Sequence, residues 1–284
     1  MQVGDKIKIT ADGKTVNWKV PIYLLTPGHG NMKIAKSEKL GIYSTKALHL
    51  APSTMSGYNT CPKASKGCKA VCLTYSGQGQ CYRQGELYNS RVHRSRIGKT
   101  ILLHEHKAFF FKKLKREIDN FIIKCTKKGT KPAIRLNCTS DLPWEKMKDP
   151  STKKSLMELY PNVQFYDYTK ILSRLNKVPE NYFLNFSRSE SNEKEVIKAL
   201  EMGINVCVVF LKDEYPSNYK GYRIIDGDKT DLRFLDNKFF ENHTGKGIVV
   251  GLKSKGWKSK KDLSGFVILP EQWKEIENIQ KAVA

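Results

Sequence analysis

Four of the seven cysteines in this 284-residue chain lie close together, at Cys61, Cys68, Cys72 and Cys81. Their spacing is C-x6-C-x3-C-x8-C, in a stretch rich in Gly, Ser and Pro that shows no regular apolar period. Side chains on irregular backbone can converge on one centre, and the thiolate of cysteine is a strong metal ligand. The first hypothesis is therefore thiolate ligation of a metal centre by these four residues.

The spacing favours an iron–sulfur cluster over zinc. Structural zinc sites usually show two close cysteine pairs, whereas here only Cys68 and Cys72 form one. A cluster tolerates looser spacing and favours backbone N–H groups that can approach its sulfurs. Three glycines leave the backbone approachable: Gly67, Gly77 and Gly79. We therefore expect an iron–sulfur cluster, with zinc as the alternative and disulfides or uncoordinated thiols as a third interpretation.

The chain is strongly basic, with 50 Lys and Arg against 28 acidic residues and a formal charge of +22. Residues 82–131 hold fourteen Lys and Arg but four acids, which is +10 of that total. Such an excess makes nucleic acid a candidate partner, and a solvated helical face is the alternative. The candidate contacts are Arg91, Arg94, Arg96, Lys99, Lys112, Lys113, Lys253, Lys255, Trp257 and Lys258.

No apolar run approaches the length of a membrane span, and the N-terminal residues lack the pattern of a signal peptide. An odd number of cysteines in a dense cluster argues against a disulfide framework. These features predict a cytoplasmic protein without a membrane partner, and they leave its oligomeric state open.

The apolar pattern predicts a single α/β domain, divided into lead-in strands (1–57), a cysteine loop (58–81), basic helices (82–131), strand and helix repeats (132–269) and a C-terminal helix (270–284). The lead-in strands are expected at Lys19–Leu25 and Gly41–Leu50. The basic helices are expected at 86–97 and 100–124. Alternating strands and helices indicate a mainly parallel sheet, open or curled into a complete or partial barrel with fewer than eight full units.

Within this pattern the second basic helix shows one apolar stripe, which makes its aromatic residues core rather than a surface for base stacking. The stripe is Phe109, Phe110, Leu114, Ile118, Phe121, Ile122 and Cys125. The later strands are expected at Ala133–Asn137, Val163–Tyr168, Tyr182–Ser187, Ile204–Phe210, Tyr222–Asp226 and Ile248–Leu252. A helix is expected at Ser189–Met202, with Asn192 and Glu195 as a capping box and Gly203 as its stop.

Hydrophilic residues follow the predicted strands, where a parallel sheet places its functional face. The candidates are Asn137, Ser140, Asp141, Asp167, Ser187, Arg188, Asp226 and Asp228. Helix capping is the structural alternative for many of them. Asp141, Asp167, Asp226 and Asp228 also allow a metal-dependent phosphoesterase, although they form no compact motif.

Several motifs resemble the phage gene-product-eighty-eight family over residues 20–260. They are Ser56-Gly57-x-Asn59-Thr60-Cys61-Pro62, Gly67-Cys68, Cys72-Leu73, Arg135-Leu136-Asn137, Thr139-Ser140-Asp141, Trp144-Glu145, Phe186-Ser187-Arg188-Ser189, Asp226-Gly227-Asp228, Asp231-x-Arg233-Phe234 and Gly251-Leu252-x-x-Lys255-Gly256. The cysteine motif is the most specific of these. The resemblance implies a phage-encoded protein of the host cytoplasm, with an iron–sulfur cluster on a barrel similar to the radical-SAM fold.

The chain departs from the radical-SAM loop C-x3-C-x2-C at one position. Cys68 and Cys72 fit, but Tyr75 stands where the third cysteine is expected. Cys61 then becomes the third ligand, and Cys81 can occupy the fourth site and close the cluster to S-adenosylmethionine. The sequence thus predicts a 4Fe–4S protein of undetermined redox or enzymatic role, with a candidate action on nucleic acid. The alternative is a zinc-stabilised, basic nucleic-acid-binding protein without catalysis.

Overall fold

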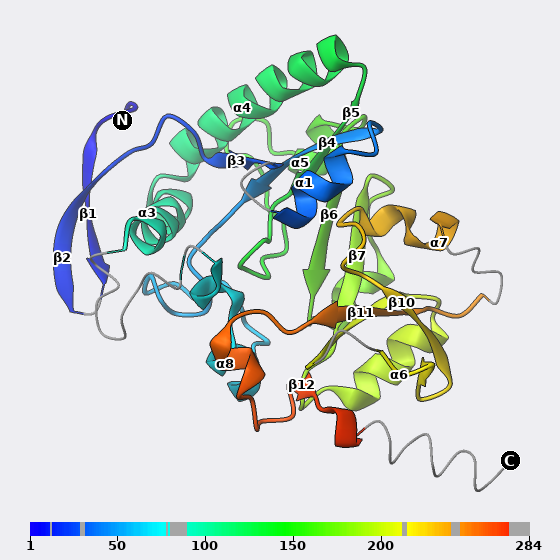
Figure 1. Ribbon diagram of the computed structural model, residues 1–284. Coiled ribbons are helices and arrows are strands. Elements are labelled where there is room, and N and C mark those ends of the chain that lie inside the picture. The colour runs from blue at the N-terminus through cyan, green and yellow to red at the C-terminus, as the bar shows by residue number, and fades with distance from the viewer. Residues whose placement is uncertain are drawn as a thin grey trace, which may run out of the picture. The chain divides into compact units, whose positions relative to one another are not determined.

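The helices and strands follow the alternation of apolar runs along the chain (Figure 1). The computed structural model describes residues 1–11, 13–28, 32–77, 79, 90–211, 215–239 and 245–272. The strands are β1 Lys6–Ala11, β2 Lys14–Lys19, β3 Leu25–Pro27, β4 Tyr43–Leu48, β5 Lys131–Arg135, β6 Gln164–Thr169, β7 Tyr182–Ser187, β8 Val206–Phe210, β9 Asn218–Tyr219, β10 Tyr222–Asp226, β11 Val249–Lys253 and β12 Val267–Ile268. The helices are α1 Met32–Glu38, α2 Lys66–Ala70, α3 Arg91–Glu105, α4 Lys107–Lys128, α5 Leu156–Leu159, α6 Glu193–Glu201, α7 Asp236–Phe239 and α8 Trp257–Lys260, with 3-10 turns η2 Leu73–Tyr75, η5 Leu172–Asn176 and η6 Arg233–Leu235.

The residues gather into two compact units. The first comprises Met1–Pro62, Thr74–Asp167 and Val178–Phe183, and the second comprises Lys63–Leu73, Tyr168–Lys177 and Leu184–Ala284. The strands β6 and β7 each contain residues of both units. The cysteine segment is also divided, because Cys61 belongs to the first unit and Cys68 and Cys72 to the second.

In the first unit the strand order is β3-β4-β5-β6-β7. The pair β3–β4 is antiparallel, whereas β4–β5 and β5–β6 are parallel. Helix α4 turns Phe110, Leu114 and Phe121 inward, where they are buried. A separate antiparallel hairpin, β1–β2, packs Ile9 and Trp18 against Ile97 of α3. Burial of these apolar side chains is what holds the hairpin to the helix.

In the second unit the strand order is β7-β8-β11-β10-β9, and β12 pairs with β8 beside this path. The pairs β7–β8, β8–β11, β10–β11 and β8–β12 are parallel, and β9–β10 is antiparallel. Helix α6 buries Val196, Ala199 and Leu200 in a core with Val208 and Phe210.

The predicted α/β class and the mainly parallel sheet are confirmed, but a closed barrel is not found among the described strands. Their order runs along an open path from β3 to β9. β3 has three residues and ends in Pro27, and β9 has two residues. Both pair antiparallel with their neighbours. Short edge strands, and a proline that lacks an N–H, are poor templates for further pairing.

The predicted break between the two basic helices near residue 98 is wrong. Helix α3 continues through Gly98, and the break falls at His106, whose φ is −127° and ψ 46°. A Cβ atom on Gly98 would lie 2.3 Å from Cδ2 of Trp18. Glycine is therefore needed there for close packing rather than as a stop. The start of the predicted helix 86–97 lies outside the described residues, as does most of the predicted helix 270–284.

The buried stripe of the second basic helix is confirmed for Phe110, Leu114, Ile118, Phe121 and Cys125. The strand predictions at Tyr182–Ser187 and Tyr222–Asp226 match β7 and β10. The four other late strands are found with their ends shifted by one or two residues.

The capping box predicted for α6 is wrong. The helix starts at Glu193, and the Asn192 side chain makes no cap hydrogen bond to it. Instead, Asn192 accepts from the N–H of Ser189 at 2.7 Å and donates to the carbonyl of Ser187 at 3.0 Å, which orders the turn after β7. Gly203 does end the helical region, with a φ of +78°.

The N-terminal strands are only partly as predicted. β4 lies within the predicted range 41–50, but Lys19–Leu25 is not one strand, because β2 ends at Lys19 and β3 starts at Leu25. The Glu117 carboxylate accepts from the N–H groups of Leu24 at 2.7 Å and Leu25 at 2.9 Å, so these groups are bound to a side chain instead of a strand. Among the described residues, no helix has the length and apolar character required to cross a bilayer.

Candidate metal and nucleic-acid sites

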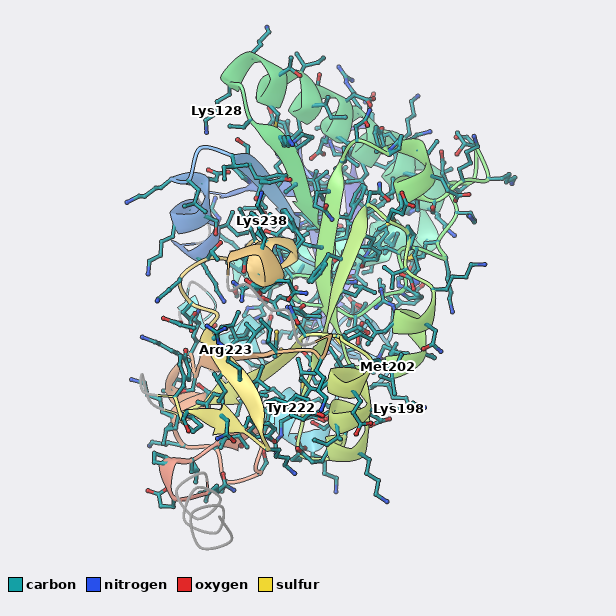
Figure 2. All side chains as sticks on the ribbon, turned by 90° about the vertical axis from the view of Figure 1, so that its right-hand side faces the viewer. Lys128, Lys198, Met202, Tyr222, Arg223 and Lys238 are labelled. Carbon is teal, nitrogen blue, oxygen red and sulfur yellow. The ribbon has the colours of Figure 1, made fainter. Side chains whose placement is uncertain are left out.

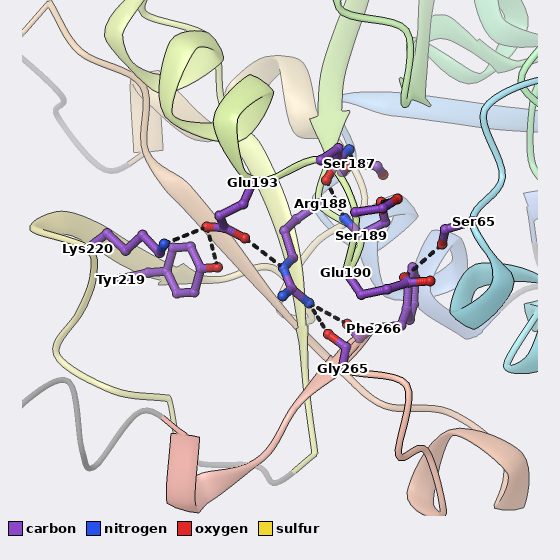
Figure 3. Close-up of polar contacts among 12 residues, drawn as sticks. Ser65, Ser187, Arg188, Ser189, Glu190, Glu193, Tyr219, Lys220, Gly265 and Phe266 are labelled. Atoms are coloured by element: carbon purple, nitrogen blue, oxygen red, sulfur yellow. Dashed lines mark hydrogen bonds and ion pairs between the residues drawn. The ribbon is translucent and has the colours of Figure 1, made fainter.

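The segment that carries Cys68 and Cys72 is anchored within the second unit by Glu190 (Figure 3). One carboxylate oxygen of Glu190 accepts from Ser65 Oγ and the other accepts from the N–H of Gly67, both at 2.7 Å. Ser65 in turn caps helix α2, because its Oγ accepts from the N–H of Cys68 at 3.1 Å. A Cβ atom on Gly67 would lie 2.2 Å from Ser264 Oγ, so only glycine fits. The result is a short, clamped helix that presents half-buried Cys68, with half-buried Cys72 just beyond its end.

Cys61 lies in the first unit, beside the loop that follows β5. Its N–H donates to Asn59 Oδ1 at 3.0 Å, and its Sγ lies 3.8 Å from the carbonyl oxygen of Thr139. The preceding Thr60 donates from Oγ1 to the carbonyl of Ala51 and accepts at its own carbonyl from the N–H of Asp141 at 2.8 Å. These contacts place Cys61 at the carboxyl-terminal edge of β4 and β5.

The four-cysteine ligand set stays a prediction. Cys81 lies outside the described residues, and Cys61 belongs to a different unit from Cys68 and Cys72. Within the described ranges, no group of three or more His, Cys, Asp or Glu side chains is gathered as metal ligands are. Cys125 and Cys207 are buried, and Cys138 is half-buried after β5. The donor chemistry of Cys68 and Cys72 fits a thiophilic metal, because both are thiols on one turn of chain.

The polar residues predicted at the end of β5 are brought together in the first unit, where they organise the backbone. The Asn137 amide oxygen accepts from Ser140 Oγ at 2.8 Å, from the N–H of Leu142 at 3.0 Å and from Trp144 Nε1 at 3.2 Å. Asp167 is fully buried and accepts from the N–H groups of Leu136 at 3.2 Å and Asn137 at 2.8 Å. Tyr182 also donates to Asp167, at 3.0 Å. The carboxylate of Asp167 thereby fixes the end of β5.

Two predicted site residues lie at the end of β7 (Figure 3). The carbonyl of Ser187 accepts from Asn192, and Arg188 binds residues of the second unit. The Arg188 guanidinium pairs with Glu193 at 3.2 Å and donates to the carbonyls of Gly265 and Phe266. Burial alone would raise the pKa of Glu193, but Tyr219, Lys220 and Arg188 together lower it. Arg188 thus has an ion-pair partner within its own unit.

Asp226 is the last residue of β10 and Asp228 follows the strand, and both bind backbone N–H groups. Asp226 Oδ1 accepts from the N–H of Asp228 at 2.9 Å. Asp228 Oδ2 accepts from the N–H of Lys253 at 2.7 Å, and its Oδ1 lies 3.3 Å from Lys255 Nζ. Burial, with these two carboxylates nearby, raises the pKa of Tyr215. Asp226 and Asp228 thereby join the ends of β10 and β11.

The candidate nucleic-acid contacts on α3 and α4 differ in the exposure of their side chains. Arg91 and Lys112 are exposed and Arg94 is half-buried. Arg96 donates to the carbonyl and hydroxyl of Thr74, and Lys113 is paired with Glu117 at 3.5 Å. Lys99 is 7% exposed and donates to the carbonyl of Leu24 at 2.7 Å. The assignment of Lys99 as a surface contact is therefore wrong, because its ammonium is bound inside the first unit.

The basic loop near the C-terminal end of the described chain forms helix α8. Trp257 is 57% exposed, so it is not tucked against the core, and Lys258 Nζ lies 5.8 Å from the centre of its ring. Lys255 is paired with Asp228, and Lys253 is half-buried at the end of β11. This part of the surface therefore presents the Lys258 ammonium beside the exposed ring of Trp257.

Two features of the structure were not predicted from the sequence. Glu190 lies three residues after the end of β7, and that position was the available signal for its contact with Ser65, 125 residues earlier. His49 follows β4, and burial together with Arg96, Lys99 and Arg135 lowers its pKa to about 3. Burial also lowers the pKa of Lys99 to about 8, although Glu117 opposes this shift. No local pattern reports such long-range neighbours.

Taken together, the described residues define a mixed α/β protein with a mostly parallel sheet and a clamped helical segment that carries Cys68, with Cys72 just beyond it. The chain belongs to the phage gene product 88 family, whose model matches residues 23–269. The match includes β3 to β12 and leaves the β1–β2 hairpin outside. Comparisons with curated proteins and with solved structures gave no match.

Proposed function

We propose that this protein holds a metal centre through the thiolates of Cys68 and Cys72, with Cys61 and Cys81 completing the ligand set. A 4Fe–4S cluster is the first candidate, and zinc is the second. The observation that supports the proposal is the clamp on α2, in which Glu190 binds Ser65 and Gly67 and so fixes the helix that carries Cys68. Ligands that are held in place before binding lose less entropy when the metal arrives.

The chemistry of this segment suits thiolate ligands. Cys68 lies on α2 and Cys72 follows the end of the helix by two residues, so both thiols are carried by one short segment. Three lysines in the same segment, Lys63, Lys66 and Lys69, offset the negative charge of a thiolate-bound centre. Glu190 is already engaged with Ser65 and Gly67, so its role is to position α2.

Cys61 and Cys81 extend the set from either side. Cys61 is separated from α2 by residues 62–65, and Cys81 is nine residues beyond Cys72. A bound cluster would supply electron transfer or a redox-sensitive structural centre. The chain's own residues supply the thiolates, the clamp and the basic surroundings.

The test is anaerobic purification of the full chain, followed by absorption spectroscopy and analysis of iron, sulfide and zinc. A brown protein with equal iron and sulfide supports the cluster. A colourless protein that retains zinc supports the alternative. A wild-type protein that holds neither metal, even after anaerobic reconstitution, overturns the proposal.

Matched cysteine variants show whether the assigned thiols are responsible. Cys68→Ser and Cys72→Ser should each lose most of the metal. Cys125→Ala and Cys207→Ala remove buried thiols that lie on α4 and β8, and both should retain it. Full metal content in Cys68→Ser would contradict the ligand assignment. Cys138→Ser tests whether the remaining half-buried thiol, which follows β5, contributes to metal binding.

A further inference from the structure

Helix α4 carries more basic side chains than are paired with other described residues of the first unit. Its sequence contains eight Lys and Arg residues and two acids, Glu117 and Asp119. Three of the eight have partners within the unit: Lys107 lies over the ring of Phe111, Lys113 pairs with Glu117, and Lys115 pairs with Asp149. The other five are exposed: Lys112, Arg116, Lys124, Lys127 and Lys128. We call these five residues the basic face, and with the described residues they form no ion pair or side-chain hydrogen bond.

Four of the five residues of the basic face lie away from the buried side of the helix. At about 100° per residue, Lys112, Arg116, Lys124 and Lys127 fall within an arc of roughly 120°, away from Phe121. They extend over about 22 Å of helix at 1.5 Å per residue. Lys128 adds a charge at the carboxyl-terminal end of α4 (Figure 2). The face is rigid, because the other side of α4 is anchored in the core by Phe110, Leu114 and Phe121.

The like charges of this arrangement repel one another and lower the stability of α4. The contacts of the described residues do not offset this loss. Lys112 and Arg116 are four residues apart, as are Lys124 and Lys128, and like charges at this spacing destabilise a helix. Lys127 and Lys128 regain some of this from the helix dipole at the carboxyl-terminal end.

The nearest acid on the same side does not relieve the repulsion. The Asp119 carboxylate accepts a hydrogen bond from Tyr160 at 2.9 Å and makes no ion pair with Arg116, three residues earlier. The charge of the basic face is therefore left for a partner outside the described chain.

We propose that the basic face of α4 binds the phosphate backbone of double-stranded nucleic acid without reading its sequence. A straight line of cations about 22 Å long matches roughly two thirds of a duplex turn. Contacts to phosphates position a protein on the duplex but carry no base information. This interface does not depend on the proposed metal centre.

Two other polyanionic partners fit less well. Single strands are bound on exposed aromatic rings, but Phe110, Phe111 and Phe121 are buried and Phe109 is half-buried. A membrane-surface helix inserts its apolar side, and in α4 that side forms the core of the unit.

The experiment measures binding of the full chain to a fluorescent 20-base-pair duplex across a salt series. The test variant combines Lys112→Gln, Arg116→Gln, Lys124→Gln and Lys127→Gln. The control combines Lys6→Gln, Lys8→Gln, Lys154→Gln and Lys194→Gln, which removes the same charge from exposed lysines elsewhere. Glutamine is a good helix former, so the test variant should keep α4, and the control changes only exposed side chains. Circular dichroism and thermal unfolding will check that both variants fold.

We expect the test variant to bind at least about tenfold more weakly at low salt, with the slope of log K against log salt reduced by about 3–4. The control should retain most of the affinity and slope. Equal losses in the two variants would mean that only net charge matters, and would overturn the proposal. So would tighter binding to a single strand of equal length, binding only to anionic lipid vesicles, or no duplex binding at 50 mM salt.

Discussion

The backbone N–H of Gly67 donates to the carboxylate of Glu190 at 2.7 Å, which joins the start of α2 to the turn that follows β7. The two residues are 123 positions apart in the chain. Because the same carboxylate also accepts from Ser65, Glu190 determines where the cysteine-bearing helix begins.

Replacement of Glu190 should loosen the segment 63–73. Glu190→Ala removes two hydrogen bonds to a charged acceptor, each worth about 1.5–3 kcal/mol. We expect faster amide hydrogen exchange at Cys68 and lower metal retention, with a smaller effect for Glu190→Gln. Glu201→Ala, at an exposed position of α6, is the matched control. Unchanged exchange at Cys68 in Glu190→Ala would show that the clamp is not needed.

Asp167 should contribute to stability rather than to chemistry. It is fully buried and accepts from two backbone N–H groups and from Tyr182. Asp167→Asn should lower the free energy of unfolding by about 2–3 kcal/mol, and Tyr182→Phe by about 1 kcal/mol. Urea denaturation measures both effects, with the exposed Glu201→Gln as control. Wild-type stability in Asp167→Asn would refute the assigned backbone role.

Gly98 is the position where close packing overrides helix propensity. Alanine is favoured over glycine in a helix by about 1 kcal/mol, yet a Cβ here would lie 2.3 Å from the ring of Trp18. Gly98→Ala should therefore destabilise the protein. In a Trp18→Leu background the same change should become neutral or stabilising. A double-mutant cycle by thermal unfolding measures this coupling. Additive effects would contradict a direct clash between the two residues.

The ligand set also predicts no radical chemistry. Tyr75 stands where a third loop cysteine is expected, and Cys81 is available as a fourth thiolate. Reconstituted wild-type protein, reduced with dithionite and supplied with S-adenosylmethionine, should form no 5′-deoxyadenosine. Product that appears only in Cys81→Ala would identify Cys81 as the closing ligand. Catalytic amounts from the wild type would reverse the prediction.

The strands could be predicted because their signal is local. Tyr182–Ser187 and Tyr222–Asp226 are short apolar runs bounded by polar residues, and they are β7 and β10. The roles of particular side chains depend on residues far away in sequence. Lys99 resembles a surface cation until Leu24, 75 positions earlier, supplies its acceptor. Asp167 resembles a catalytic carboxylate until Asn137 is found bound to it. Charge and polarity mark such residues, but only packing shows whether they are used internally.

His49 should make the protein sensitive to acid. Burial, with Arg96, Lys99 and Arg135 nearby, lowers its pKa to about 3 in the folded chain, against about 6.5 when unfolded. Between these values the unfolded chain binds a proton that the folded chain does not, so stability rises with pH across this window. From pH 6.5 down to pH 5, this group alone should remove about 2 kcal/mol.

The measurement compares urea unfolding of wild type and His49→Gln at pH 5, 5.75 and 6.5. Other groups titrate in both proteins, so the difference between the two curves reports His49. As the pH falls from 6.5 to 5, the free energy of unfolding should decrease more for the wild type than for the variant. The two decreases should differ by about 2 kcal/mol. Parallel curves for wild type and His49→Gln would show that the folded protein accepts a proton at His49 as readily as the unfolded chain does.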